Sequence, residues 1–128
     1  MPLNVSHRSR LTALLFGLSA LSSGSLPAAD LPDDLALDGD AVAGREVATD
    51  RAKGNCVACH VMAGAESPGT IGPVLVSMQT RFPSKRDLAA QIWDATAKNP
   101  EAVMPPFGKH EILTRQEFVD VVEYIWSL

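Results

Sequence analysis

Apolar residues recur at helical spacing in three separate segments of this chain. The clearest repeat is near the carboxyl end, at positions i, i+3, i+4 and i+7: Phe118, Val121, Val122 and Ile125. The residues just before it, Thr114-Arg115-Gln116-Glu117, have the form of a capping box. The pattern therefore predicts a terminal helix that begins at residue 115.

A second helix is predicted over residues 41–53. Asp40 is suited to cap its first turn, and Gly54 is suited to end it. Gly44 inside this segment costs about 1 kcal/mol relative to alanine, so we expect it to allow another helix to come close.

A third helix is predicted between these two. Ser84-Lys85-Arg86-Asp87 resembles a capping box with aspartate in its last position, and Asn99-Pro100 closes the segment, so the helix should run from 85 to about 97. Residues 61–83 and 100–113 are rich in glycine and proline and predict two long loops. Loops of this length in a compact domain usually have a function. The pattern predicts an all-α, single domain over residues 40–128.

The first 29 residues have the layout of a secretory signal peptide. A positive stretch at residues 7–10 precedes an apolar run at 11–21, and small residues follow as far as Ala29. The apolar run is shorter than the ~20 residues that span a bilayer, which disfavours a membrane anchor. We expect cleavage after Ala28 or Ala29 and export to the periplasm, and we interpret the acidic residues 30–39 as a mobile arm.

Charge excludes one class of partner. The chain has 11 Lys and Arg, of which Arg8 and Arg10 lie in the predicted signal peptide, and all 15 Asp and Glu lie beyond it. The remaining nine basic and 15 acidic residues give a net charge of −6. Nucleic-acid binding, which needs a basic surface, is therefore not expected.

Cys56-Val57-Ala58-Cys59-His60 has the C-x-x-C-H spacing of a covalent c-type haem site. Two thiols at this spacing can add to the two vinyl groups of one porphyrin, and His60 then lies beneath the ring as an axial ligand of the iron. The motif predicts one covalent haem c held by Cys56, Cys59 and His60.

Other uses of these two cysteines are less consistent with the sequence. A structural disulfide would close too small a loop to constrain the unfolded chain. A thioredoxin-like pair would follow a strand, and no alternating β pattern is present. A zinc site could draw on His60 and His110 in addition, but without zinc-finger spacing. A thiol redox or metal-binding protein stays an alternative.

The second axial ligand is predicted to be Met104. Pro105 and Pro106 stiffen the loop around it, so a weak thioether ligand can be held at low entropic cost. Met62 is too close to His60 in sequence to reach the other face of the ring. The remaining candidates are Met78, His110, Lys98 and Lys109, with His110 the next choice. A His/Met iron would have no open position, which favours electron transfer over oxygen chemistry.

The first loop offers a partner for the other nitrogen of His60. A ligating histidine usually donates its second N–H to a carbonyl or carboxylate group. Gly72-Pro73 is placed to supply that carbonyl, so Pro73 is a candidate haem-site residue; a simple turn is the alternative.

These motifs resemble the class I cytochrome c family. The resemblance rests on Gly54-Asn55-Cys56-Val57-Ala58-Cys59-His60, Gly72-Pro73-x-Leu75, Met104-Pro105 and a terminal helix with Tyr124 and Trp126. It implies three main helices and two long loops that pack against the haem, with the first and last helices crossed. Gly44 and Tyr124 match the usual small and aromatic partners at that crossing.

A narrower resemblance is to the SoxX cytochromes of the periplasmic sulfur-oxidation (Sox) system. It rests on Gly69-Thr70-Ile71-Gly72-Pro73, Met78-x-x-Arg81-Phe82-Pro83, Asn99-Pro100 and Met104-Pro105-Pro106-Phe107-Gly108. It implies a heterodimer with SoxA, a second c-type cytochrome, in a complex that couples thiosulfate oxidatively to a carrier-protein cysteine, as an L-cysteine S-thiosulfotransferase does. In that family the reacting site is on the partner and the X subunit accepts electrons. A free-standing periplasmic electron carrier is the alternative.

Overall fold

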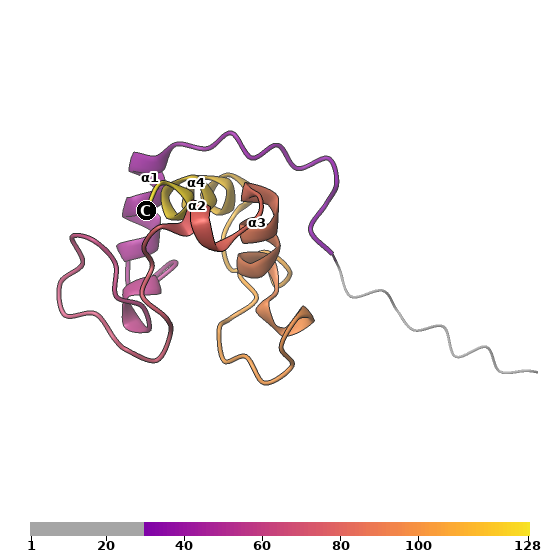
Figure 1. Cartoon of the computed structure of the whole chain (residues 1–128). Coiled ribbons are helices and arrows are strands. Elements are labelled where there is room, and N and C mark those ends of the chain that lie inside the picture. The colour runs from indigo at the N-terminus through magenta and orange to yellow at the C-terminus, as the bar shows by residue number, and fades with distance from the viewer. Residues whose placement is uncertain (1–29) are drawn as a thin grey trace, which may run out of the picture.

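The computed structural model describes residues 30–128, so the predicted signal peptide lies outside the described residues. The chain forms a set of helices and no named strand in this range, apart from one isolated bridge between Met62 and Leu75. In order, the elements are α1 (Ala41–Thr49), the 3₁₀ turn η1 (Cys56–Ala58), α2 (Met78–Arg81), α3 (Lys85–Trp93), the 3₁₀ turn η2 (Ala95–Ala97) and α4 (Arg115–Ser127). The all-α prediction is confirmed. Figure 1 shows two long loops, residues 59–77 and 98–114, on the same side of the helices.

The crossing of α1 and α4 organises the domain. A β-carbon added at Gly44 would lie 1.9 Å from the carbonyl oxygen of Asp120 and 2.9 Å from Cβ of Tyr124. Only glycine lets the two backbones come this close, which confirms the expectation for Gly44 and its aromatic neighbour.

Helix α4 forms the centre of the core. Thr114 and Glu117 make both hydrogen bonds of the predicted capping box, so the helix begins where the sequence predicts. The apolar face is almost fully buried: Phe118, Val121, Val122 and Ile125 are each 3% exposed or less. The ring of Trp93 on α3 meets that of Phe118 edge to face at 5.3 Å.

Two helices are shorter than the apolar pattern predicts, and an aspartate ends each. Helix α1 stops at Thr49, because Asp50 has extended backbone angles and its carboxylate accepts from the amide of Ala52. Helix α3 stops at Trp93, because Asp94 is extended and its carboxylate caps η2. Aspartate side chains compete with the helix for backbone N–H groups, so they favour such breaks.

Helix α2 lies in a segment for which the sequence predicts only loop. It is a single four-residue turn, too short to show a periodic pattern. Met78 anchors it with 2% exposure, and the amide of Ser77 donates to the carbonyl of Leu128 at 2.7 Å. Contact with the end of α4 forms this turn, and local sequence does not reveal that contact.

The acidic residues 30–39, interpreted from composition as a mobile arm, lie across the domain in the structure (Figure 1). Leu35 is 5% exposed and belongs to the core. Arg86 donates to the carbonyl of Pro32 at 2.8 Å, and Lys85 donates to that of Leu37 at 3.3 Å. One buried leucine and two basic residues on α3 therefore attach the segment.

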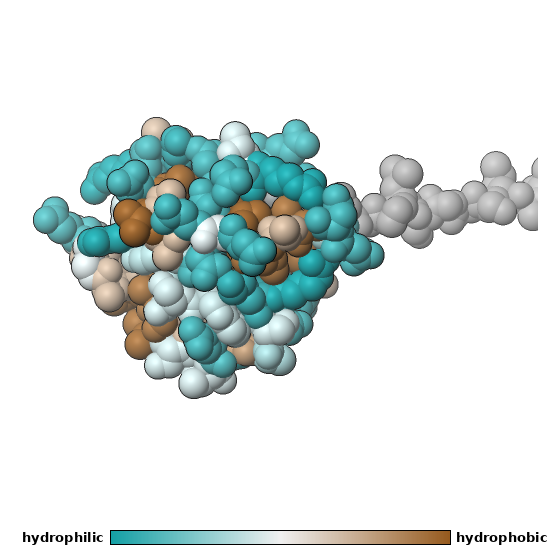
Figure 2. All heavy atoms as spheres, turned by 90° about the horizontal axis from the view of Figure 1, so that it is seen from above, coloured by the Kyte–Doolittle hydropathy of each residue, from teal (hydrophilic) through white to brown (hydrophobic). Residues whose placement is uncertain are grey.

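Figure 2 shows the face seen from above, where hydrophilic residues prevail and apolar ones gather in small separate areas.

Candidate functional site

The C-x-x-C-H motif is folded into a tight turn after α1. Asn55 has left-handed backbone angles, with φ 46°, and starts η1. The amide of His60 then donates to the carbonyl of Cys56 at 2.9 Å. Both cysteines and the histidine are half-buried. The backbone of this turn therefore holds the three motif residues within one short, hydrogen-bonded segment.

The first long loop returns along this motif and is bonded to it at three points. The carbonyls of Val57, Cys59 and Val61 accept from the amides of three residues at 2.8 Å each: Gly69, Gly72 and Leu75. A β-carbon at Gly69 would lie 1.9 Å from the carbonyl oxygen of Ala58, so glycine permits this contact. The loop is therefore held in register with the motif.

The register places Pro73 beside His60. Nδ1 of His60 lies 2.7 Å from the carbonyl oxygen of Pro73. A carbonyl oxygen can only accept, so Nδ1 carries the proton and Nε2 keeps its lone pair for a metal. Gly72 touches the same ring, since a β-carbon there would lie 2.3 Å from Cε1. Hydrogen bond and contact together fix the orientation of the imidazole.

Cys56 and Cys59 are not joined by a disulfide bond. Burial raises the pKa of Cys56 to about 11. At neutral pH its thiol is thus protonated, whereas redox-active thiols have lowered pKa values. This environment disagrees with the thioredoxin-like alternative.

The methionines differ in what surrounds their sulfur atoms. Met62 is buried, and its sulfur accepts from the hydroxyl of Tyr124 at 3.8 Å. Met78 is buried too, and its sulfur lies 3.5 Å from an Arg81 nitrogen. Met104 is half-buried at the margin of the core. Met62 and Met78 are core residues with partners, whereas Met104 stands in the second loop.

His110, the next candidate ligand, is exposed. It belongs to a turn in which its amide donates to the carbonyl of Pro106 at 3.0 Å. Across residues 30–128, no group of three or more His, Cys, Asp or Glu side chains comes together as a metal site. The four-ligand zinc arrangement of Cys56, Cys59, His60 and His110 is therefore not formed.

One residue that supports the site could not be identified from the sequence motifs. Arg81 on α2 donates to the carbonyl of Val74 at 2.6 Å and so supports the loop next to Pro73. Its position in Met78-x-x-Arg81-Phe82-Pro83 was the only signal in the sequence.

A hollow of about 420 Å³ lies elsewhere, lined by Leu35, Trp93 and Phe118 among others, and touches none of the predicted site residues.

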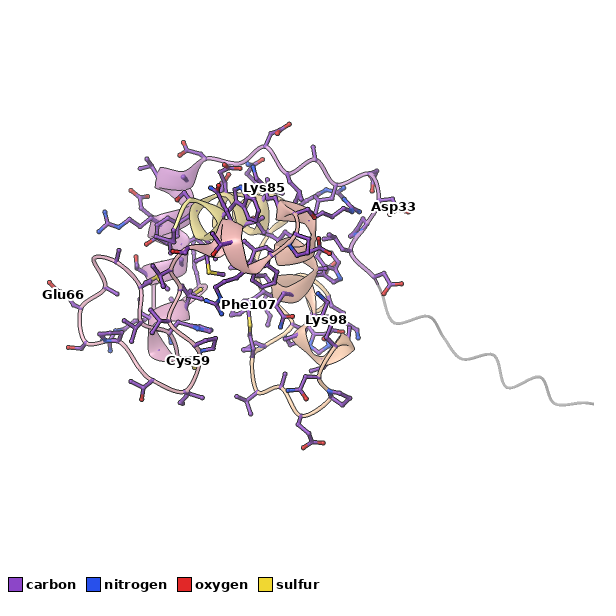
Figure 3. All side chains as sticks on the ribbon, in the orientation of Figure 1. Asp33, Cys59, Glu66, Lys85, Lys98 and Phe107 are labelled. Atoms are coloured by element: carbon purple, nitrogen blue, oxygen red, sulfur yellow. The ribbon has the colours of Figure 1, made fainter. Side chains whose placement is uncertain are left out.

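The donors present fit a covalent haem. Two cysteines lie in one short turn, the imidazole of the residue that follows them has a free Nε2, and a half-buried thioether lies in the second loop. Figure 3 shows Cys59 in the loop region on one side and Lys98 on the other, with Phe107 between them. A histidine nitrogen and a methionine thioether are the iron ligands of a His/Met haem, and two thiols at this spacing are the groups that link such a porphyrin covalently.

Comparison with known proteins points the same way. The family model for cytochrome c matches residues 41–128. The chain is similar to the crystal structure of SoxXA from P. pantotrophus, with 28% identity and a TM-score of 0.63; the match covers 70% of this chain and 81% of that one. No protein of curated function matches the chain. None of the helices between residues 30 and 128 has the length and apolar character needed to cross a membrane.

Proposed function

The chain belongs to the cytochrome c family, and on that premise we propose that it is the monohaem electron-transfer subunit of a SoxAX-type complex. Such a complex joins thiosulfate oxidatively to a cysteine of a carrier protein. The observation that carries the proposal is the likeness to SoxXA over 70% of this chain. The proposed partner is a SoxA-type c-type cytochrome, and the proposed location is the periplasm, which the signal-peptide layout of residues 1–29 supports.

Family membership implies a covalent haem c. We assign its two thioether links to Cys56 and Cys59, and its axial ligands to His60 and Met104. When bound, the haem supplies a one-electron couple between ferric and ferrous iron. The chain orients the proximal imidazole through Pro73 and keeps Met62 and Met78 engaged elsewhere. His60 and Met104 would together hold the iron and would leave it no open position for substrate.

The same residues assign the sulfur chemistry to the partner. The proposed haem links use both cysteines of the chain, so no thiol would be left as a nucleophile. We therefore propose that the subunit accepts electrons while the reacting cysteine belongs to the partner.

The partner surface should include the motif edge. Ala58 is exposed, whereas Val57 is half-buried against the core. Nearby in the first loop, Ile71 and Val74 are 73% and 50% exposed. These apolar side chains would let a partner haem approach without desolvating charge, which favours rapid transfer.

An assay of the isolated subunit and of the complex, with thiosulfate and the carrier protein, tests this function. Only the complex should form the carrier–thiosulfate conjugate, and the haem of this chain should be reduced as the conjugate forms. Conjugation by the lone subunit, or a haem that stays oxidised, would contradict the proposal. A free-standing periplasmic carrier would then be the better function, and a second haem subunit would not copurify with it.

A further inference from the structure

Both ends of the loop that carries Met104 meet at one buried carboxylate. Asp94, directly after α3, is only 5% exposed. Its oxygens accept from the amide and hydroxyl of Thr96 at 3.0 and 2.5 Å, and from Nζ of Lys109 at 2.6 Å. Residues 95–108 therefore form a closed loop whose outgoing and returning ends are tied to the same side chain.

The outgoing end is held by capping. Asp94 is the N-cap of η2, which starts the loop. The next turn is closed by Asn99, whose carbonyl accepts from the amide of Ala102 at 2.9 Å and whose side chain accepts from that of Glu101 at 3.1 Å. Order extends from Asp94 to within two residues of Met104.

The returning end is held by Lys109 and its neighbours. The amide of Lys109 donates to the carbonyl of Trp93 at 3.2 Å. Gly108 lies flat against the Trp93 ring, since a β-carbon there would be 1.9 Å from Cε3. Phe107 is 7% exposed, within the core. The returning end of the loop thus packs against the end of α3, and the ion pair of Lys109 with Asp94 further stabilises this contact.

The pair is sheltered compared with the other ion pairs of residues 30–128. The side chains of Asp94 and Lys109 are 5% and 26% exposed, whereas Lys53, paired with Glu117, is 48% exposed. The hydrogen bond from Lys109, followed by those from Thr96, lowers the pKa of Asp94 to about 2. The carboxylate is therefore ionised at neutral pH, and the hydrogen bond is charge-assisted.

We infer that the Asp94–Lys109 pair is a positioning pair that keeps Met104 in place as an iron ligand. The inference rests on the ligand role of Met104 in the proposed function. A thioether is a weak, neutral ligand, so the fraction of protein with Met104 attached depends on how much freedom its loop regains on release. Opening the pair removes one of the contacts that hold the returning end of the loop, and so increases that freedom.

Imidazole binding to the ferric holoprotein measures this fraction directly. An added ligand binds only the molecules from which Met104 is detached, so its apparent affinity is proportional to their population. We expect Asp94→Asn and Lys109→Gln each to raise the apparent affinity about tenfold and to weaken the sulfur-to-iron absorption band. Asn retains an acceptor for Thr96, so Asp94→Asn removes mainly the charge.

Three further variants separate positioning from general effects. Lys109→Arg retains the cation and should restore near wild-type imidazole affinity. Lys98→Gln makes the same charge change in the same loop at a residue outside the Asp94–Lys109 ion pair, and should leave the affinity unchanged. The double variant of Asp94→Asn and Lys109→Gln should bind imidazole no more tightly than the stronger single variant, because both remove one interaction.

The possible failures are distinguishable. If imidazole affinity stays within about twofold of wild type in both single variants, or rises equally in Lys98→Gln, the pair does not position Met104. If Met104→Ala retains the sulfur-to-iron band, the ligand assignment itself is wrong and this inference falls with it. Loss of the band in Met104→Ala with unchanged affinity in the pair variants would overturn the inference alone.

Discussion

The chemistry of individual residues depends on what each polar atom already contacts. His60 donates from Nδ1 to Pro73, which leaves Nε2 as its metal-binding atom. The sulfur atoms of Met62 and Met78 have partners in the core, whereas Met104 stands at its margin. Residue type alone does not distinguish the four methionines as possible iron ligands. In the described residues, burial and hydrogen bonding of the sulfur atoms distinguish Met104 from the other two.

Met104→Ala should remove the weak sulfur-to-iron band at the red end of the ferric spectrum. It should also lower the reduction potential, because an uncharged thioether favours the ferrous iron. Visible spectroscopy and a redox titration of the holoprotein measure the two effects. Met78→Ala is the matched control and should retain the band; loss of the band in that variant but not in Met104→Ala would contradict the assignment.

Capping residues determine where the helices begin and end, and packing determines where they lie. Helix α4 starts at a capping box that can be recognised in the sequence, and its Glu117 also pairs with Lys53 in the turn that follows α1. The hydrogen bond from Lys53, then those from Thr114, lower the pKa of Glu117 to about 2. One carboxylate thus stabilises the start of α4 and its link to α1.

That carboxylate predicts a specific pH dependence of stability. A depressed pKa in the folded state means that Glu117 stabilises the fold above about pH 4.5, and that this contribution is lost as the pH falls through about 2. Glu117→Gln retains the capping geometry but not the charge, so it should cost about 1 kcal/mol at pH 7, because half-exposed ion pairs are weak. Urea unfolding of the holoprotein should show this difference shrinking towards zero near pH 2.

Glu66→Gln, at an exposed loop position, serves as the control and should change stability little at any pH. A Glu117→Gln difference that does not vary with pH would mean that the charge of Glu117 does not contribute.

The whole molecule is a small helical domain with the site between two loops on one side. Its N-terminal segment crosses α3 and α4 with Leu35 in the core, so the folded unit extends beyond the helices that the apolar pattern predicts. The two long loops, which contain no helix or named strand, carry the proposed axial ligands His60 and Met104.

The mature protein should contain one covalent haem and lack its first 28 or 29 residues. Thiol addition to both vinyl groups leaves the mass of the polypeptide plus one haem, with no free thiol. Intact-mass spectrometry and amino-terminal sequencing of the exported protein, made in a host that matures c-type cytochromes, measure both features. An unmodified mass with two free thiols would contradict the haem, and an intact leader would contradict export.

Sequence alone determined the features that depend on local chemistry. The C-x-x-C-H spacing and the capping box at Thr114 both follow from nearby residues and general stereochemistry. The fold class was predictable for the same reason, because the apolar period of α4 is local.

Tertiary structure decided what depends on residues far apart in the chain. Helix α2 exists because Met78 and Ser77 meet the end of α4, and the segment at 30–39 is placed by Leu35 and the basic residues of α3. Asp94 ends α3 through its own short-range preference, but its pairing with Lys109 depends on the path of the loop between them. Period and spacing report only on neighbours along the chain, whereas these contacts form only when the core is assembled.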